Sequence, residues 1–426
     1  MRTYMRITLG TLGIAAAGAA LGGCNFDVSN PGPVQGKYLN DPRAAQAIVN
    51  GAGRDLSEAL NWIAYTGAAV SREVFPAGST GSFGITPNQQ IGLLTDDETN
   101  THWDLAQRAR FEADSGNKFM KRSLTDYAKN KLAAQILLWS GYTYRLLGEN
   151  MCEAVIDGSA AMPSTAFLDS AIARFTTALG VAQAAGDTRS VSAALAGRAS
   201  VLADLGRWPD AIADAQQVAD GFVYQMPYYV TDVDQYNRIY WATANQPYRA
   251  HTVWNTPYET YYASTKDPRV PWDTSTSQKV GDAAVLSLGR VQWHFETKFS
   301  KKDAAMNLSS GWEMRLLEAE NLLMGGDVPN AMMLINKHRV ALKLQPWSAT
   351  TADEAWTALK RERGIELWLE GRRLGDLRRW KATSAPGDLS PLEQAGSATS
   401  YLSANQNLCF PIPLSEKQTN PHFTSP

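Results

Sequence analysis

Apolar residues recur every three or four positions along much of the chain, and one long segment without any period interrupts them. Residues 43–65 and 124–147 show this spacing most clearly, which predicts amphipathic α-helices. Asp41 followed by Pro42 is typical of a helix start, because Asp caps free N–H groups and proline suits the first helical position. Residues 75–95 are rich in Gly, Ser, Thr and Pro and predict a loop.

The predicted helices end in a short turn that recurs along the chain. Leu147-Gly148-Glu149, Leu205-Gly206-Arg207 and Met324-Gly325-Gly326 each close one helical stretch, and Leu369-Glu370-Gly371 lies late in a fourth. A glycine is expected there because it adopts a left-handed backbone at the least cost. Further helices are predicted from Trp208 and over residues 327–342. Helix, glycine turn and helix is the tetratricopeptide pattern, so we predict an all-α fold of helical hairpins with irregular spacing.

Residues 221–272 have a different character, with thirteen aromatic residues, five prolines and no sustained period. Such a segment predicts long loops with short helices, and long irregular insertions in a compact domain are usually functional. Flat rings can cover the apolar face of a sugar while polar neighbours satisfy its hydroxyls. The candidate ligand-binding residues are Trp241, Tyr248, Trp254, Tyr258, Tyr261 and Tyr262, with Arg269 as a candidate hydrogen-bond donor. The alternative is that these rings pack the insertion onto the helices and that Arg269 forms a structural ion pair.

The first 24 residues carry an export signal. Arg2 and Arg6 form a positively charged start. The apolar run over residues 7–20 that follows is too short to span a bilayer, and Leu21-Gly22-Gly23-Cys24 comes after it. This ending resembles the bacterial lipobox, in which the cysteine thiol is the nucleophile that takes up lipid. We therefore expect a signal peptide over residues 1–23, a lipidated tether over 24–40 and a single domain over 41–426. An ordinary secretory signal with a chance cysteine is the alternative.

The other two cysteines and the charge balance narrow the classes of function. An exported chain meets an oxidising compartment, so Cys152 and Cys409 are expected to form a disulfide, with two unpaired buried thiols as the alternative. Three cysteines cannot form a zinc site of four thiolates. Lys and Arg total 40 against 42 Asp and Glu, and this formal net charge of −2 argues against a nucleic-acid partner.

The densest charged segment covers residues 360–380. Glu362, Glu366 and Glu370 are four residues apart, so one helix would place their carboxylates on one face. Such a face suits a glycosidase acid–base pair or a metal site. Like charges repel, however, and seven Lys and Arg residues are interleaved, so a structural ion-pair network is favoured. The histidines are scattered and neither a Gly-x-Ser-x-Gly elbow nor a phosphate loop is present, so we expect no catalysis, metal or cofactor.

Two C-terminal motifs resemble the signature of the SusD/RagB family. The first is residues 362–380, which read ERGIELWLEGRRLGDLRRW, and the second is Pro411-Ile412-Pro413 followed by Glu416 and Asn420-Pro421. The lipobox and Asp267-Pro268-Arg269 resemble the family less specifically. The resemblance implies a helical fold built on about four tetratricopeptide-like hairpins. It also implies a surface-exposed lipoprotein of the bacterial outer membrane, which Asn25 after Cys24 favours as well.

The same resemblance implies a function. Members of the family bind nutrients, most often oligosaccharides and sometimes peptides, and lie over a SusC-like TonB-dependent transporter. We therefore expect an oligosaccharide to bind the insertion around residues 221–300 and to pass to such a transporter without catalysis. The alternatives are a peptide or other small-nutrient binder, a glycosidase using Glu362, Glu366 or Glu370, and a lipoprotein whose hairpins contact other proteins.

Overall fold

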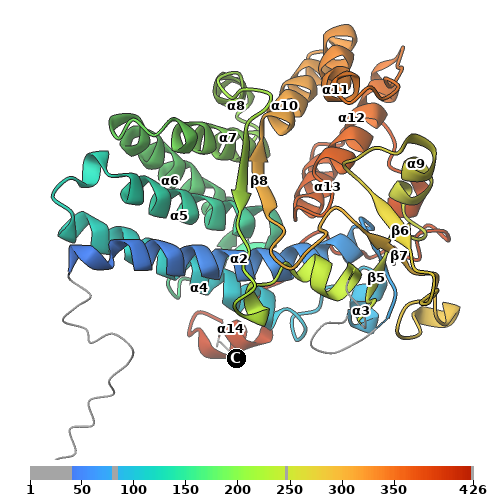
Figure 1. The fold of residues 1–426 in the computed structure, drawn as a ribbon, viewed down its shortest axis with the longest axis horizontal. Helices are drawn as coiled ribbons and strands as arrows, with labels where there is room; N and C mark the ends of the chain where they lie inside the picture. Colours follow the sequence, from blue (N-terminus) through green and yellow to red (C-terminus); the bar gives the residue numbers. More distant parts are fainter. Residues whose placement is uncertain (1–40, 79–84, 245–247, 424–426) are drawn as a thin grey trace, which may run out of the picture. The chain divides into compact units, whose positions relative to one another are not determined.

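Helical hairpins make up most of the computed structural model, which describes residues 41–78, 85–244 and 248–423 (Figure 1). The predicted signal peptide, Cys24 and the tether lie outside the described residues. The chain from Ala45 onward belongs to one compact unit. In the described part of the chain, no helix combines the length and the hydropathy that a membrane span requires. The predicted all-α fold with tetratricopeptide-like hairpins is confirmed.

The first two hairpins contain the longest helices. Helix α2 (Ala45–Val70) packs against α4 (Asn100–Ser123), and α5 (Lys131–Asn150) packs against α6 (Thr165–Ala184). The sequence prediction placed the start of α5 at residue 124, which is wrong. That region instead ends α4 and forms a short turn, and α5 starts later because the side chain of Asn130 accepts a hydrogen bond from the Leu132 N–H.

Two further hairpins turn at the glycines that the sequence indicates. Helix α7 (Thr188–Asp204) is followed by α8 (Trp208–Ala215), and α10 (Gly311–Met324) by α11 (Val328–Ala341). Gly206 and Gly326 have φ angles of 71° and 80°, in the left-handed region that favours glycine. Apolar residues of α7, α8 and α10 share one buried cluster, which joins these two hairpins across the sequence between them.

The last hairpin differs from the sequence prediction at its turn. Helix α12 (Ala352–Glu366) ends four residues before Glu370, and α13 (Arg373–Ala382) follows. Leu369 and Gly371 have φ angles of 62° and 71°, so the chain reverses there. The prediction that Glu370 continues one helix face with the two preceding glutamates is therefore wrong.

The aromatic-rich insertion starts and ends on one pair of strands. Strand β4 (Val223–Met226) pairs antiparallel with β8 (Met306–Ser310), and Figure 1 shows them running side by side next to α7 and α10. Gly311 follows β8 directly, and a Cβ atom there would overlap the carbonyl oxygen of Ala219. The glycine therefore permits the close approach that returns the chain to the hairpins.

Short elements organise the rest of the insertion, as the lack of a period predicts. Strand β1 (Phe75–Pro76) pairs with β5 (His251–Thr252), and β6 (Trp272–Thr274) pairs with β7 (His294–Glu296). Helix α9 (Pro257–Thr265) lies between these pairs in sequence. The remaining short elements elsewhere in the described chain are η2 (Pro42–Ala44), α3 (Pro87–Gln90), η3 (Tyr127–Lys129), β2 (Glu153–Ala154), β3 (Met162–Pro163), η7 (Pro391–Glu393) and α14 (Leu414–Thr419).

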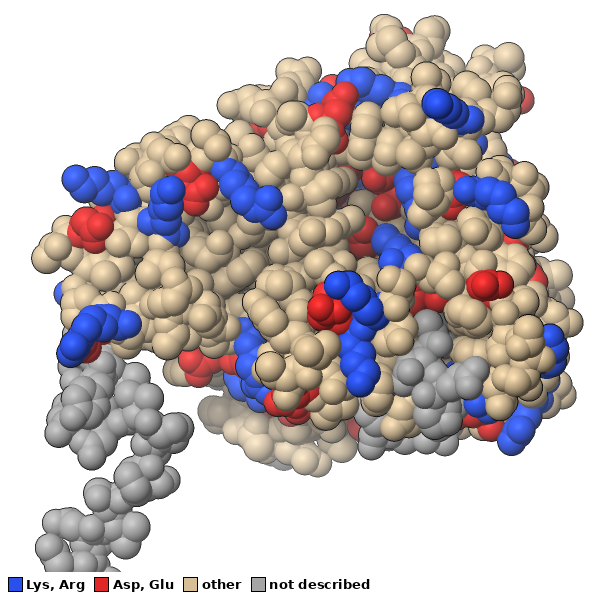
Figure 2. Space-filling view, viewed as in Figure 1, with Lys and Arg blue, Asp and Glu red and all other residues tan. Residues whose placement is uncertain are grey.

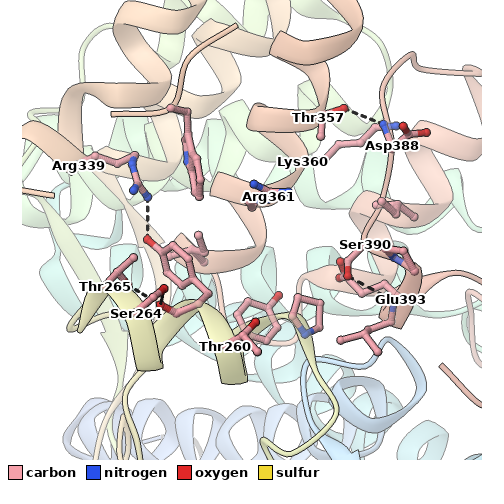
Figure 3. A pocket seen from close by; sticks show the side chains of 18 of the residues that line it. Thr260, Ser264, Thr265, Arg339, Thr357, Lys360, Arg361, Asp388, Ser390 and Glu393 are labelled. Atoms are coloured by element: carbon pink, nitrogen blue, oxygen red, sulfur yellow. Dashed lines mark hydrogen bonds between the residues drawn. The ribbon is translucent and has the colours of Figure 1, made fainter. Parts of the chain in front are cut away.

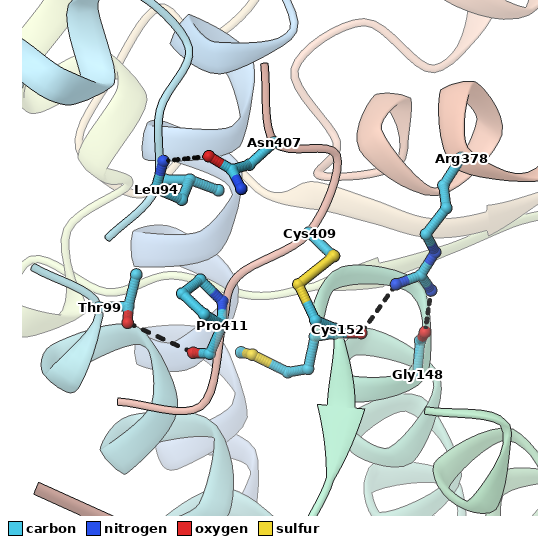
Figure 4. The surroundings of a disulfide bond; sticks show 9 residues. Leu94, Thr99, Gly148, Cys152, Arg378, Asn407, Cys409 and Pro411 are labelled. Carbon is cyan, nitrogen blue, oxygen red and sulfur yellow. Dashed lines mark hydrogen bonds between the residues drawn. A yellow bond between two sulfur atoms is a disulfide. The ribbon is translucent and has the colours of Figure 1, made fainter. Parts of the chain in front are cut away.

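A disulfide joins the end of α5 to the C-terminal segment (Figure 4). Cys152 and Cys409 are bonded, with 5.0 Å between their Cα atoms and 257 residues between them in sequence. Backbone hydrogen bonds extend this junction, because Cys152 N–H donates to the Phe410 carbonyl and Phe410 N–H donates to that of Asn150. Arg378 of α13 donates to the carbonyls of Met151 and Gly148, so three distant segments meet at this bond.

The face shown in Figure 2 carries positive and negative side chains side by side rather than one extensive basic area. This distribution agrees with the near balance of 40 basic and 42 acidic residues in the sequence. Because binding to a phosphate backbone depends on a basic surface, this face offers no such footprint.

Candidate functional site

A cavity of about 850 Å³ lies between the insertion and the last helical hairpin. Its walls come from α9, from the connection between α11 and α12, from α12 itself, and from residues 388–393 (Figure 3). This volume falls in the range of about 300–1,000 Å³ that is usual for pockets that bind small molecules. We therefore take it as the candidate site.

Local sequence explains how α9 presents its rings. Thr256 is extended and Pro257 occupies the first turn, which starts the helix. Lys266 ends it with a left-handed φ of 55°. Tyr258 and Tyr261 are three residues apart, so both lie on the same side of this short helix and line the cavity.

Helix α12 supplies the opposite wall. Thr351 and Glu354 form a capping box at its start, which fixes the register of the helix. Thr357, Lys360 and Arg361 follow at helical spacing and extend toward the cavity (Figure 3). The backbone N–H of Asp388 donates to the hydroxyl of Thr357, which holds the 388–393 segment beside the helix.

Tyr258 is nearly buried, and its hydroxyl makes no hydrogen bond to the described part of the chain. Its exposed fraction is 3%, and its ring lies 5.4 Å from that of Trp368. Burial raises the pKa of its hydroxyl well above the ordinary value, so the phenol is a neutral donor. Within the described residues this hydroxyl makes no hydrogen bond, although buried hydroxyls usually have one.

Two guanidinium groups surround the indole of Trp347. Arg339 lies 4.0 Å from the ring centroid and Arg361 lies 4.9 Å from it, both in range for cation–π attraction. The Trp347 indole N–H donates to Glu362, and the ring of Tyr261 lies 5.8 Å from that of Trp347. These contacts hold the indole at the cavity wall.

Hydrogen bonds fix the remaining polar groups of the wall to different degrees. The Tyr261 hydroxyl donates to Asp267 and accepts from Arg339, and burial, followed by the bond to Asp267, raises its pKa to about 12. The Lys360 ammonium donates to the carbonyls of Ala385 and Gly387. Burial, and then the charge of Arg373, lowers the pKa of Lys360.

The structure places the sequence-predicted residues in separate clusters. Tyr258 and Tyr261 line the cavity. Trp241 lies 5.6 Å from Tyr248, and the Lys302 ammonium lies over the Trp241 ring, outside this cavity. Tyr262 packs against Trp272, and Trp254 packs edge-on against Phe75. The aromatic residues of the insertion therefore do not form one continuous platform.

Arg269 belongs to a buried ion-pair network. It donates to Asp267, Glu362 and Glu366 over 2.6–3.0 Å, and its side chain is 9% exposed. Burial alone would raise the pKa of Glu366, but the hydrogen bond from His338 and the charge of Arg269 lower it overall. This is the structural alternative that the sequence also indicated for Arg269.

The three glutamates have structural partners: Glu362 and Glu366 share the Arg269 guanidinium, and Glu370 lies in a separate contact. Glu362 accepts from Arg269, Arg339 and Trp347, whereas Glu370 accepts from Lys298 and Asn307. All three carboxylates are buried in these contacts. A glycosidase needs a carboxylic acid that reaches the substrate, and this arrangement gives the glutamates structural partners instead.

Trp347, Arg339 and Arg361 line the cavity but were not predicted from the sequence as ligand-binding residues. Trp347 stands between Pro346 and Ser348 in a short connection between two helices. It therefore carries the same signal, an aromatic residue among turn-forming residues, that selected the candidates in the insertion. The two arginines carry no signal of their own, because only the fold brings them to the indole.

Comparison with known proteins identifies the family. The sequence model of the SusD family matches residues 212–425, which is about half of the chain, and the protein belongs to this family. The earlier resemblance is thus confirmed. Among curated proteins, none matches the sequence.

Solved structures share the fold at low identity. A SusD/RagB family protein of Bacteroides thetaiotaomicron has a TM-score of 0.65 and 12% identity, over 89% of this chain and 95% of that chain. A SusD superfamily protein of Bacteroides vulgatus has a TM-score of 0.63 and 15% identity, over 90% and 98%. A SusD-like carbohydrate binding protein of the same species has a TM-score of 0.61 and 17% identity, over 80% and 83%.

Proposed function

We propose that this protein captures an oligosaccharide in the cavity between α9 and α12. The observation that carries the proposal is the combination of aromatic walls with two polar groups that make no hydrogen bond within the described residues, the Tyr258 hydroxyl and the Arg361 guanidinium, which contacts the face of Trp347. One similar solved structure is described as a carbohydrate binding protein, which supports this class of ligand.

The chemistry of the walls suits a sugar. A sugar ring has an apolar C–H face and a rim of hydroxyls, so it needs flat apolar surface and hydrogen-bond partners together. Tyr261 and Trp347 supply rings, and Thr260, Ser264 and Ser390 supply hydroxyls along the same cavity (Figure 3). Each sugar hydroxyl left without a partner would cost about 1–3 kcal/mol, so these polar groups decide which ligand fits.

Replacing Trp347 with alanine is expected to weaken oligosaccharide binding about tenfold, which corresponds to about 1.4 kcal/mol. The change removes ring surface and frees Arg361 from its cation–π contact. Titration calorimetry with oligosaccharides selected from a glycan array measures the effect. Trp347→Phe, which keeps a ring and loses only the N–H donation to Glu362, should bind nearly as well as the unchanged protein.

A control variant separates the cavity from the insertion as a whole. Tyr229 belongs to the insertion, is 53% exposed and does not line the cavity. Tyr229→Ala should therefore bind like the unchanged protein. The proposal fails if Trp347→Ala and Tyr229→Ala bind equally well, or if peptides bind and no glycan does.

We further propose that the protein is anchored by lipid at Cys24 in the outer membrane and passes its ligand to a SusC-like TonB-dependent transporter. The lipobox and the family membership support this proposal. At about 0.8 kcal/mol per buried methylene, two or more acyl chains would hold the protein on the membrane stably.

Replacing Cys24 with alanine is expected to abolish labelling by radioactive palmitate and to move the protein out of the outer-membrane fraction. Cell fractionation with metabolic labelling measures both effects. Asn25→Ala, which leaves the thiol in place, should still be labelled. Equal labelling of the Cys24→Ala variant would contradict the anchor.

A further inference from the structure

The charged groups that line the cavity are unequal in number. Four basic residues line it, namely Arg339, Lys360, Arg361 and Arg373, against two acidic residues, Asp388 and Glu393. Arg373 donates to Glu393 over 2.7 Å, so this pair neutralises itself. Arg339 has its own carboxylate partner behind the wall, Glu362, at 3.1 Å. The excess charge therefore rests with Lys360 and Arg361.

Lys360 is the less available of these two cations. Its ammonium already donates to two backbone carbonyls, and the carboxylate of Asp388 acts on its charge. Figure 3 shows Lys360 extended toward Asp388, on the side of the cavity away from Arg339. A ligand would have to replace these contacts to use this ammonium.

Arg361 is held in place but has no counter-ion. Its residue is exposed, and among the described residues its guanidinium has no carboxylate within 4.0 Å and no hydrogen bond. The contact with the face of Trp347 restricts where the group points, while the fork of N–H donors stays unused. A guanidinium binds a carboxylate through two parallel hydrogen bonds, which suits this unused fork.

A second donor faces the same space. Tyr258, which is 3% exposed, lines the cavity, and its hydroxyl makes no hydrogen bond in the described part of the chain. It packs close to α12, since a Cβ atom at Gly364 would lie 2.8 Å from its oxygen. A neutral phenol donates to an acceptor oxygen, so Tyr258 adds a second polar group to the residues that line the cavity.

We propose that the preferred ligand is an acidic oligosaccharide, in which Arg361 binds the carboxylate of a uronic acid residue. The inference rests on the proposed function, because it names the ligand class of the same cavity. The rings of Tyr261 and Trp347 and the hydroxyls of the wall then receive the neutral parts of the sugar. Charge attraction in a partly enclosed site makes the carboxylate contact the main source of selectivity.

The test compares acidic probes with their uncharged counterparts. The probes are trigalacturonate, an alginate tetrasaccharide and a hyaluronan tetrasaccharide, each also in its carboxyl-reduced form, with a neutral glycan array alongside. At least one acidic probe should bind, and its carboxyl-reduced form should bind about tenfold more weakly or worse. Raising the salt concentration should weaken the acidic probe more than the reduced one.

Variants assign the effect to one residue. Arg361→Gln should lose the preference, so that the acidic probe and its reduced form bind with affinities within about twofold of each other, whereas Arg361→Lys, which keeps the charge without the fork, should fall between. Because Arg361 is exposed and has no hydrogen bond to the described chain, both variants should keep the melting temperature. Arg290→Gln changes another exposed arginine that does not line the cavity and should have no effect.

The possible failures point to different conclusions. Equal binding of acidic and reduced probes, or an Arg361→Gln variant that keeps the preference, overturns the acidic ligand and leaves oligosaccharide capture in place. Binding of neutral glycans without binding of any acidic probe likewise overturns the acidic ligand and leaves oligosaccharide capture in place. If neither the acidic probes nor the neutral array binds, the proposed function fails together with this inference, and binding of peptides alone leads to the same result.

Discussion

Replacing Arg372 with leucine is expected to lower the free energy of unfolding by about 3–5 kcal/mol, because it leaves buried carboxylates without their cation. Arg372 is 7% exposed and forms ion pairs with Glu149 of α5 at 3.0 Å and with Glu313 of α10 at 2.8 Å. It stands just before α13, so one guanidinium joins three hairpins. Burial raises the pKa of Glu149 to about 7 even beside this arginine.

Urea denaturation followed by circular dichroism measures this effect. The matched control is Arg207→Leu, since Arg207 pairs with Asp210 while both side chains are more than half exposed, at 52% and 59%. That change should cost at most about 1 kcal/mol. Comparable losses in the two variants would show that the Arg372 ion pairs do not join the hairpins. Glu313→Leu added to Arg372→Leu should recover part of the lost stability, because it removes an unpaired carboxylate while Glu149 keeps its other cation, Arg145, at 3.4 Å.

Replacing both Cys152 and Cys409 with serine is expected to lower the free energy of unfolding by about 3–5 kcal/mol. The disulfide closes a loop of 257 residues, and chain entropy gives long loops the largest stabilisation. Adding reducing agent to the unchanged protein should lower its denaturation midpoint to about that of the double variant. The double variant itself should not respond to reducing agent, which serves as the control.

Hydrogen exchange shows where the double serine variant loses stability. The N–H groups of Cys152 and Phe410 are hydrogen-bonded across the junction of α5 and the C-terminal segment. These two amides should exchange faster in the double variant, while amides in the core of α10 should change much less. Unchanged exchange at the junction, together with an unchanged midpoint, would mean that the backbone hydrogen bonds of Phe410 to Asn150 and Cys152 suffice to hold the C-terminal segment.

The hairpins could be predicted from the sequence because local physics determines them. The glycine turns at Gly206 and Gly326 follow from the low cost of a left-handed backbone, and they appear in the structure with positive φ angles. The end of α12 could not be predicted in the same way. Leu369 is a good helix former, yet it adopts a φ of 62° because tertiary contacts such as the Leu369 N–H bond to Glu73 fix the turn.

The cavity was predictable only in part. Tyr258 and Tyr261 were selected as candidates by the polar neighbourhood of their segment, and both line the cavity. Trp347 and Arg361 lie outside the insertion, in the connection between α11 and α12 and in α12 itself. The periodicity of the sequence contains no information on which loop packs against which helix. Composition could indicate that rings gather in the insertion, but the separation of Trp241, Trp254 and Tyr261 into different clusters is a result of packing.

Two walls of the cavity are connections between helices rather than helices themselves. The segment bearing Trp347 and the segment around Ser390 each join or follow a hairpin. Trp347 and Leu389 rest on the core of α10 to α13, whereas Gln345 and Ser390 line the cavity outside that core. Insertions and replacements in such connections are tolerated far better than changes in a packed core. Exchange of these two short segments would therefore give the same scaffold a different ligand preference, and grafting them between relatives would test this.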